Sequence, residues 1–103
     1  MKVFLSSIAE KKIEFLMDYL EDEWSAKIKN EFLEKLKLAT SQISKFPKSC
    51  PESKKIKGIY KFTLSKQTSF YYRIVLDEIE IITLIDNRQN PDSVSKMLKK
   101  YFN

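Results

Sequence analysis

The fold of this chain is decided by residues 58–91, which read GIYKFTLSKQTSFYYRIVLDEIEIITLIDNRQNP. Side chains alternate with a period of two in residues 59–64 and again in 70–76, which predicts two β-strands. The run 79–85 is apolar at nearly every position, which is typical of a strand covered on both faces or of one whose second face is an interaction surface. Short polar segments, among them Asp77-Glu78, predict hairpin turns. The three strands should therefore form an antiparallel meander.

Two helical patterns precede these strands. Apolar residues recur at three- and four-residue steps in residues 13–24 and again in 28–43, as expected for amphipathic helices. Ser7 and Ser25 stand where helix N-caps are expected. Pro47 cannot continue the second helix. Because almost no linker separates the two helices, we expect an antiparallel helical hairpin.

The remaining elements are short. Phe4 opens a strand at the N-terminus, and Asp92 or Ser93 can cap a last helix that contains Leu98 and Tyr101. A chain of 103 residues is expected to form one domain. The predicted fold is α+β: a helical hairpin packed on a small antiparallel sheet, in the order strand, helix, helix, three strands and a short C-terminal helix.

The available chemistry is limited by the absence of histidine and by a single cysteine, Cys50. Without imidazole there is no serine, cysteine or RNase-type dyad with a histidine base, and no ordinary zinc site. One cysteine forms no internal disulfide, which suits the cytoplasm. The N-terminal segment has only three consecutive apolar residues, so we expect neither secretion nor membrane insertion. The expectation is a cytoplasmic protein with no metal and no cofactor.

Positive charge is concentrated beyond the helical patterns. Residues 1–46 hold eight lysines and eight acidic residues, so the net charge of +5 arises in the rest of the chain. In residues 48–73, Glu52 is the only acid, and the basic residues are Lys48, Lys54, Lys55, Lys57, Lys61, Lys66 and Arg73. Such a segment is typical of a surface that meets an anionic partner. A lysine-rich edge strand that resists sheet aggregation is the alternative.

The candidates for chemistry are therefore cationic and aromatic side chains. Lysine, arginine and tyrosine can stabilise charge that develops on a phosphate, so RNA cleavage without histidine is physically admissible. The candidate residues are Lys54, Lys57, Lys61, Arg73, Arg88 and Tyr101. Among them, the candidates for binding a target are Lys61, Arg73, Arg88 and Tyr101.

Several individual residues have a structural interpretation beside the functional one. Arg73 interrupts an apolar strand and needs a partner if it is buried, so an ion pair with Asp86 and a functional anion contact are both open. Arg88 follows a strand directly, in a loop, which is a common location for function. Trp24 is expected in the core, with a contact role as the alternative. Glu80 is expected to be a solvated strand acid.

The order of seven segments along the chain is more specific than any single segment. The segments are Ser6-Ser7-Ile8-Ala9, Tyr19-Leu20, Ile43-Ser44-Lys45-Phe46-Pro47, Ile59-Tyr60-Lys61-Phe62, Phe70-Tyr71-Tyr72-Arg73-Ile74, Glu80-Ile81-Ile82-Thr83-Leu84 and Ile85-Asp86-Asn87-Arg88-Gln89-Asn90-Pro91. In this order they resemble the RelE/ParE family, the toxins of bacterial type II toxin-antitoxin systems. The resemblance covers almost the whole chain. It implies a toxin that a cognate antitoxin neutralises.

The resemblance leaves the mechanism divided. RelE-like members cut messenger RNA on the ribosome, using basic residues with an aromatic residue or a histidine, whereas ParE-like members poison DNA gyrase and have lost that set. The histidine position of many members corresponds here to Asp86 or Asn87, and an acid beside a scissile phosphate is unhelpful. This departure favours a ParE-like growth inhibitor. A RelE-like ribosome-dependent endoribonuclease and a non-toxic basic binding module are the alternatives, so whether the chain is an enzyme stays open.

The resemblance also implies a complex with an acidic antitoxin that covers apolar and basic surface. The nearly unbroken apolar run in residues 79–85 suggests where apolar contacts form. The expected antitoxin contacts are Trp24, Ile79, Ile81 and Leu84.

Overall fold

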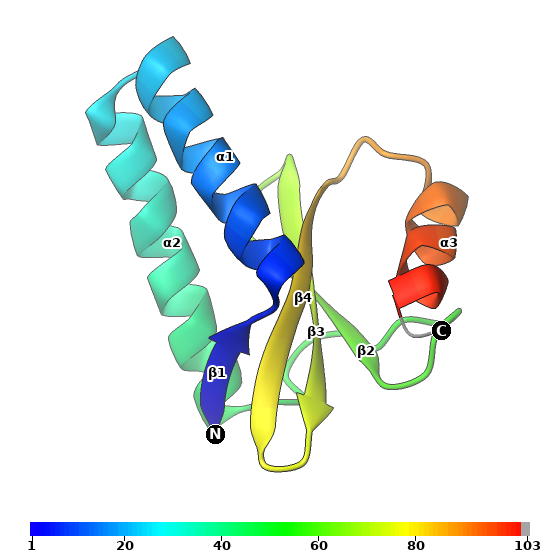
Figure 1. Cartoon of the computed structure of the whole chain (residues 1–103). Coiled ribbons are helices and arrows are strands. Elements are labelled where there is room, and N and C mark those ends of the chain that lie inside the picture. Colours follow the sequence, from blue (N-terminus) through cyan, green and yellow to red (C-terminus); the bar gives the residue numbers. More distant parts are fainter. Residues whose placement is uncertain (102–103) are drawn as a thin grey trace.

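Figure 1 shows a computed structural model of the chain, which describes residues 1–101 and the side chains of residues 1–100. A helical hairpin lies on one face of a sheet, and a third helix lies on the other. The elements are β1 (Lys2–Leu5), α1 (Ser7–Glu23), α2 (Ala26–Lys45), β2 (Ile59–Thr63), β3 (Thr68–Val75), β4 (Glu78–Asp86) and α3 (Pro91–Tyr101). The predicted α+β class and the order of its elements are confirmed.

The two long helices begin at serine caps. Ser25 Oγ accepts a hydrogen bond of 3.2 Å from the amide of Ile28, as predicted for α2. At α1 the cap is Ser6 and not Ser7: its Oγ accepts a bond of 3.0 Å from the Ala9 amide. The Ser6 hydroxyl also donates to a β4 carbonyl at 2.6 Å. This second bond ties the start of α1 to the sheet, which explains why the cap lies one residue earlier than predicted.

The sheet has the strand order β1-β4-β3-β2. The strands β2, β3 and β4 form the predicted antiparallel meander. The strand β1 pairs with β4 in parallel, so the sheet is mixed and not wholly antiparallel. Parallel pairing requires a long crossover, and here the helical hairpin and two strands lie between β1 and β4 in the chain.

The turn between β3 and β4 lies one residue earlier than predicted. Val75 pairs with Glu78, which leaves Leu76-Asp77 as the turn in place of Asp77-Glu78. Leu76 has a φ of 56° and its side chain is exposed. A leucine in this left-handed conformation is unusual, and the polar pattern of the sequence gives no sign of it.

The strand β4 is covered on both faces. Ile79, Ile81 and Leu84 are buried against the helical hairpin. Ile82 and Ile85 are buried against α3. A register irregularity lies between Tyr71 and Tyr72, where Tyr71 pairs with Thr83 and Tyr72 pairs with Ile81. The extra residue in β4 shifts the alternation of its side chains and lets apolar residues reach both cores. The first of the two alternatives, a strand buried on both faces, is therefore correct.

The burial of β4 changes the expectation for the partner-binding residues. Ile79 and Ile81 are 0% exposed and Leu84 is 5% exposed, so all three belong to the core and offer no open apolar surface. The prediction for Trp24 was wrong in the opposite direction. It was expected in the core, but it caps the C-terminus of α1 with 68% of its surface exposed.

Candidate functional site

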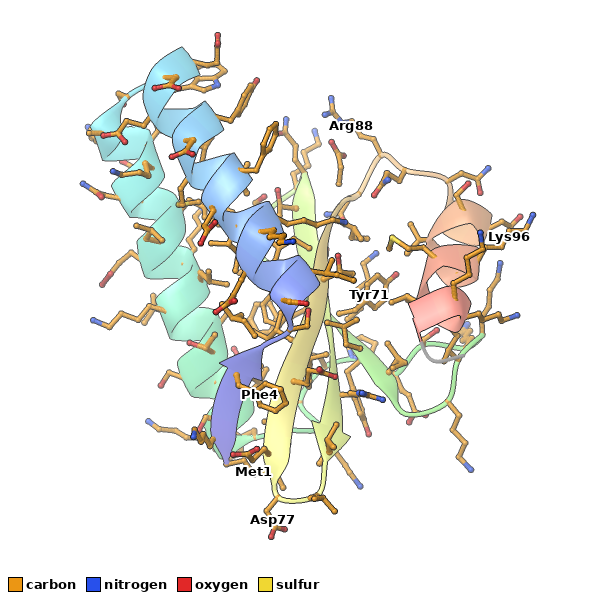
Figure 2. The ribbon with its side chains drawn as sticks, viewed as in Figure 1. Met1, Phe4, Tyr71, Asp77, Arg88 and Lys96 are labelled. Carbon is orange, nitrogen blue, oxygen red and sulfur yellow. The ribbon has the colours of Figure 1, made fainter. Side chains whose placement is uncertain are left out.

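The face of the sheet that carries α3 also carries two of the cationic candidates. Lys61 on β2 pairs with Tyr71 on β3, and Arg73 on β3 pairs with Glu80 on β4. Residues that pair directly across strands lie on the same face. Figure 2 shows Tyr71 on this face, in the space between the sheet and α3. The burial of Tyr71 raises the pKa of its phenol above the ordinary value.

Arg73 is bound by Glu80 and not by Asp86. Arg73 Nε donates to Glu80 Oε1 at 2.7 Å, with the arginine side chain 33% exposed and the glutamate side chain 11% exposed. Glu80 is therefore a buried ion-pair partner and not the solvated acid expected. Removing this guanidinium would leave the buried Glu80 carboxylate poorly solvated, so Arg73 is needed for the stability of the sheet as long as Glu80 is present.

Asp86 binds Arg88, two residues further along the chain. Arg88 Nη2 lies 2.6 Å from Asp86 Oδ2, and Arg88 Nε lies 3.0 Å from Asp86 Oδ1. The backbone amide of Arg88 also donates to Asp86 Oδ1 at 2.9 Å. The Arg88 side-chain bonds, followed by this backbone bond, lower the pKa of Asp86 to about 2. Since the Arg88 side chain is 76% exposed, this pair is open to competition from other anions.

A polar network fixes the loop that carries Arg88. Asn87 Oδ1 accepts a hydrogen bond of 2.7 Å from the hydroxyl of Ser69, which is 0% exposed. Asn87 Nδ2 donates to the carbonyls of Ser65 at 3.3 Å and Lys66 at 3.2 Å. The Asn87 amide donates to the Gln67 carbonyl at 2.7 Å. Asn87 thus joins the β4–α3 loop to the β2–β3 turn and holds Arg88 at a fixed position.

The sequence analysis missed this positioning role. A serine within an apolar and aromatic strand, together with an asparagine directly after the next strand, was the available signal. Ser69 needs a partner because it is buried, and asparagine is a frequent residue in turns because its side chain bonds nearby backbone groups.

The lysine candidates lie at the β2 edge and in the loop before it. Lys54 and Lys57 are exposed, and Lys61 is partly buried on β2, the edge strand. Within residues 1–100, none of these three lysines has an ion-pair partner. The neighbouring Lys55 binds Asp92 at the start of α3, which ties this loop to the helix.

The structure separates the two arginines among the candidate residues, Arg73 and Arg88. Glu80 and Asp86, the partners of Arg73 and Arg88, are six positions apart on β4. At about 3.3 Å for each residue, that separation is roughly 20 Å. One phosphate cannot contact both arginines across this distance. Tyr101, the remaining candidate for binding a target, lies outside the residues whose side chains the structure describes.

The site offers electrostatic stabilisation but few proton-transfer groups. The chain has no histidine, and lysine is a poor general base near neutral pH unless it is strongly desolvated. Within the described residues, no group of three carboxylate or thiol side chains is placed to hold a metal ion.

In residues 1–101, no helix combines the length and apolar character needed to cross a membrane.

Three solved structures resemble this fold over most of the chain. A chain from the chromosomal ParDE TA system of P. aeruginosa has a TM-score of 0.64 and 13% identity, covering 84% of this chain and 95% of that one. The YoeB/ParE toxin from Agrobacterium tumefaciens has a TM-score of 0.62 and 16% identity, covering 84% and 99%. The isolated E. coli RelE toxin has a TM-score of 0.60 and 12% identity, covering 97% of each chain.

Sequence comparison adds nothing to this likeness. No family model matches the chain, and no curated protein matches it. Each of the three likenesses covers at least 84% of this chain, with a TM-score of 0.60 or more. The chain therefore has the RelE/ParE toxin fold.

Proposed function

We propose that this protein is the toxin of a type II toxin-antitoxin system, a ParE-like growth inhibitor that acts on DNA gyrase in the cytoplasm and is neutralised by a cognate antitoxin. The fold supports a role as a toxin, since the P. aeruginosa, A. tumefaciens and E. coli structures that resemble it are described as parts of such systems or as toxins. Fold alone does not fix the target.

The pairing of its two arginines supports the ParE-like proposal. Arg73 and Arg88 are each bound by a carboxylate of the chain itself, Glu80 and Asp86. Messenger RNA cleavage by this fold would need several cations converging on one phosphate and a group to move a proton. Two arginines roughly 20 Å apart on β4, in a chain without histidine, are a poor basis for that chemistry. An inhibitor that only binds its target needs no such cluster.

One observation favours the RelE-like alternative, a ribosome-dependent messenger RNA endoribonuclease. Lys54, Lys57 and Lys61 have no carboxylate partner in the described part of the chain, and Lys61 pairs directly with Tyr71 on the face beside α3. Cations near a phenol can stabilise a phosphate transition state. In this case the ribosome would supply the proton-transfer groups that the chain lacks.

Expression of the protein alone in growing cells tests both proposals. We expect growth arrest, loss of negative supercoiling in a reporter plasmid and accumulation of cleaved DNA complexes, with intact messenger RNA. Messenger RNA cut within translating ribosomes, with supercoiling unchanged, would favour the endoribonuclease. Normal growth would favour a non-toxic binding module. Co-expression of the neighbouring open reading frame should restore growth if that frame encodes the antitoxin.

A further inference from the structure

The turn between β3 and β4 carries a projecting leucine. The Leu76 side chain is 92% exposed, the largest exposed fraction among the large apolar residues within residues 1–100. Its φ of 56° lies in the left-handed region, which glycine, asparagine and aspartate adopt far more easily than leucine. The chain therefore holds an apolar side chain in water and in a strained backbone conformation. A residue that is both strained and unpacked indicates contact with another molecule.

A hollow near this turn has an apolar lining. It has a volume of about 580 Å³ and lies between the end of α2 and β3. Its apolar residues are Met1, Phe46, Pro47 and Ile74. Met1 and Phe46 are 48% and 64% exposed, so the lining is open to solvent. Leu76 does not fill the hollow of its own chain, because it is not part of the lining and is almost fully exposed.

The leucine and the hollow lie at the same end of the molecule. Ile74, which lines the hollow, is two residues before Leu76 on the same hairpin. The strand β1 pairs with the first residues of β4, so the N-terminal residues lie beside the turn. Figure 2 shows Met1 and Asp77 at this end. We refer to this end as the hairpin-end surface, which comprises Met1, Phe46, Pro47, Ile74 and Leu76.

Charges of opposite sign lie on the two parts of this end. Lys45 and Lys48 line the hollow, and no acidic residue does. The turn carries Asp77 and is followed by Glu78, and residues 75–80 include no basic residue. Within residues 1–100, Lys45, Lys48 and Asp77 have no ion-pair partner. An acidic turn and a basic hollow attract each other when they belong to different molecules.

The occupant that fits both parts at once is a second copy of the chain. A twofold axis through the surface would place Leu76 of each copy in the hollow of the other, with the acidic turn against Lys45 and Lys48 in both contacts. Because the leucine and the hollow share one surface, this contact closes on itself and leaves neither part open to a third copy. An anionic membrane or a nucleic acid would instead be repelled by the carboxylates of the turn.

We propose that the hairpin-end surface is a self-association site, through which two copies form a symmetric dimer with Leu76 of each copy in the hollow of the other. The proposal does not rest on the proposed function, because it follows from the shape and charges of this surface alone. The nine residues of β4 span roughly 26 Å between this end and the loop that carries Arg88. Arg88 therefore lies clear of the contact and stays accessible in the dimer.

Sedimentation equilibrium of the purified chain tests the proposal. The apparent mass should rise from that of one chain toward that of two, with half of the chains associated at about 100 µM, as for a small transient interface. It should not rise further, because the contact is closed. Raising NaCl from about 50 mM to about 500 mM should weaken association by about fivefold, because salt screens the opposite charges. An apolar contact alone would not weaken.

Two pairs of variants locate the contact. Leu76→Asn removes the apolar side chain but suits the left-handed turn, so the fold should be kept and association should weaken by about tenfold or more. Leu38→Asn, at a residue 67% exposed on α2 and outside the hollow, should not weaken it. Lys48→Glu should weaken association by about fivefold, whereas Lys37→Glu, on α2 and outside the hollow, should not. Circular dichroism checks that each variant is folded.

A mixing experiment tests whether Leu76 enters the hollow of the other copy. Phe46→Ser removes apolar lining from the hollow but keeps Leu76. A heterodimer of Phe46→Ser with Leu76→Asn has one intact contact, whereas a dimer of either variant alone has none. The mixture should therefore associate at least about threefold more tightly than either variant alone.

Five results would each overturn the proposal. They are a chain that stays monomeric at about 1 mM, association that continues beyond two copies, association that salt does not weaken, equal effects of surface and control variants, and no gain on mixing. The first of these would assign the hollow to a different occupant. Because purified protein is used, the result is independent of toxicity.

Discussion

The ion pair between Arg73 and Glu80 should stabilise the sheet without contributing to growth inhibition. Arg73→Met keeps the apolar stem but leaves the Glu80 carboxylate, with its side chain 11% exposed, without this 2.7 Å charge-assisted bond. Breaking a fully buried ion pair costs about 3–5 kcal/mol. The arginine side chain is 33% exposed, so water can replace part of the lost interaction, and we expect a cost of about 2 kcal/mol.

A double variant separates the lost interaction from the lost charge. Glu80→Leu alone should cost less than Arg73→Met, about 1 kcal/mol, because the Arg73 guanidinium can reach solvent. Arg73→Met combined with Glu80→Leu replaces the ion pair with apolar side chains and should return to within about 1 kcal/mol of the wild-type stability. The two substitutions are therefore expected to be strongly non-additive.

Urea denaturation followed by circular dichroism measures these differences, with unchanged m-values as the check that the same surface unfolds. The folded double variant should then arrest growth as well as wild type does. Strictly additive costs would refute the ion-pair interpretation. Loss of growth inhibition in the stable double variant would show that Arg73 contacts the target.

Three further predictions concern the loop that carries Arg88. Arg88→Ala should abolish growth arrest and leave the urea midpoint almost unchanged, because Arg88 is exposed; arrest by this variant would remove Arg88 from the site. The pKa of Asp86 should lie at about 2 in wild type and return toward 3.8 in Arg88→Ala, as carboxyl NMR can measure. Since the folded-state pKa is lowered, the stabilisation from this contact, which is small because the pair is exposed, is complete above the ordinary pKa and is lost as pH falls through about 2. A titration midpoint of Asp86 that is the same in the variant as in wild type would contradict the assignment. Asn87→Ala leaves the buried Ser69 hydroxyl with only its longer, 3.3 Å bond to Thr63 Oγ1 and should cost about 1 kcal/mol. Amide exchange at Arg88 should also become faster, and exchange as slow as in wild type would show that Asn87 does not fix the loop.

Most of the fold could be predicted because the spacing of apolar residues within each segment indicates whether that segment forms a helix or a strand. The period of the helices and strands gave their order, and Ser25 and Pro47 marked the limits of α2. The cap at Ser6 was missed because its second bond, to Ile82, joins residues far apart in the sequence. The parallel pairing of β1 with β4 was missed for the same reason. The residues of a short strand do not indicate which other strand it will pair with.

The partner of Arg73 was missed because register depends on the turn. With the turn at Leu76-Asp77, Arg73 pairs with Glu80. A two-residue turn placed at Asp77-Glu78 would instead put Ile82 opposite Arg73 and leave the guanidinium without an adjacent carboxylate. One residue of error in the turn thus changed the partner of a half-buried charge. The Asp86–Arg88 pair was local and could have been found, since an aspartate commonly bonds the amide two residues on.

The two ion pairs differ in what an incoming anion would meet. To recruit Arg73, a target must take it from Glu80 and leave a carboxylate with little access to solvent. To recruit Arg88, it competes with Asp86, whose side chain is 41% exposed and can be rehydrated when released. The desolvation cost opposes the first exchange far more than the second. Arg88, held at a fixed position by Asn87 and lying in a hollow beside Tyr19 and Trp24, is therefore the arginine that a target or a partner can engage without weakening the sheet.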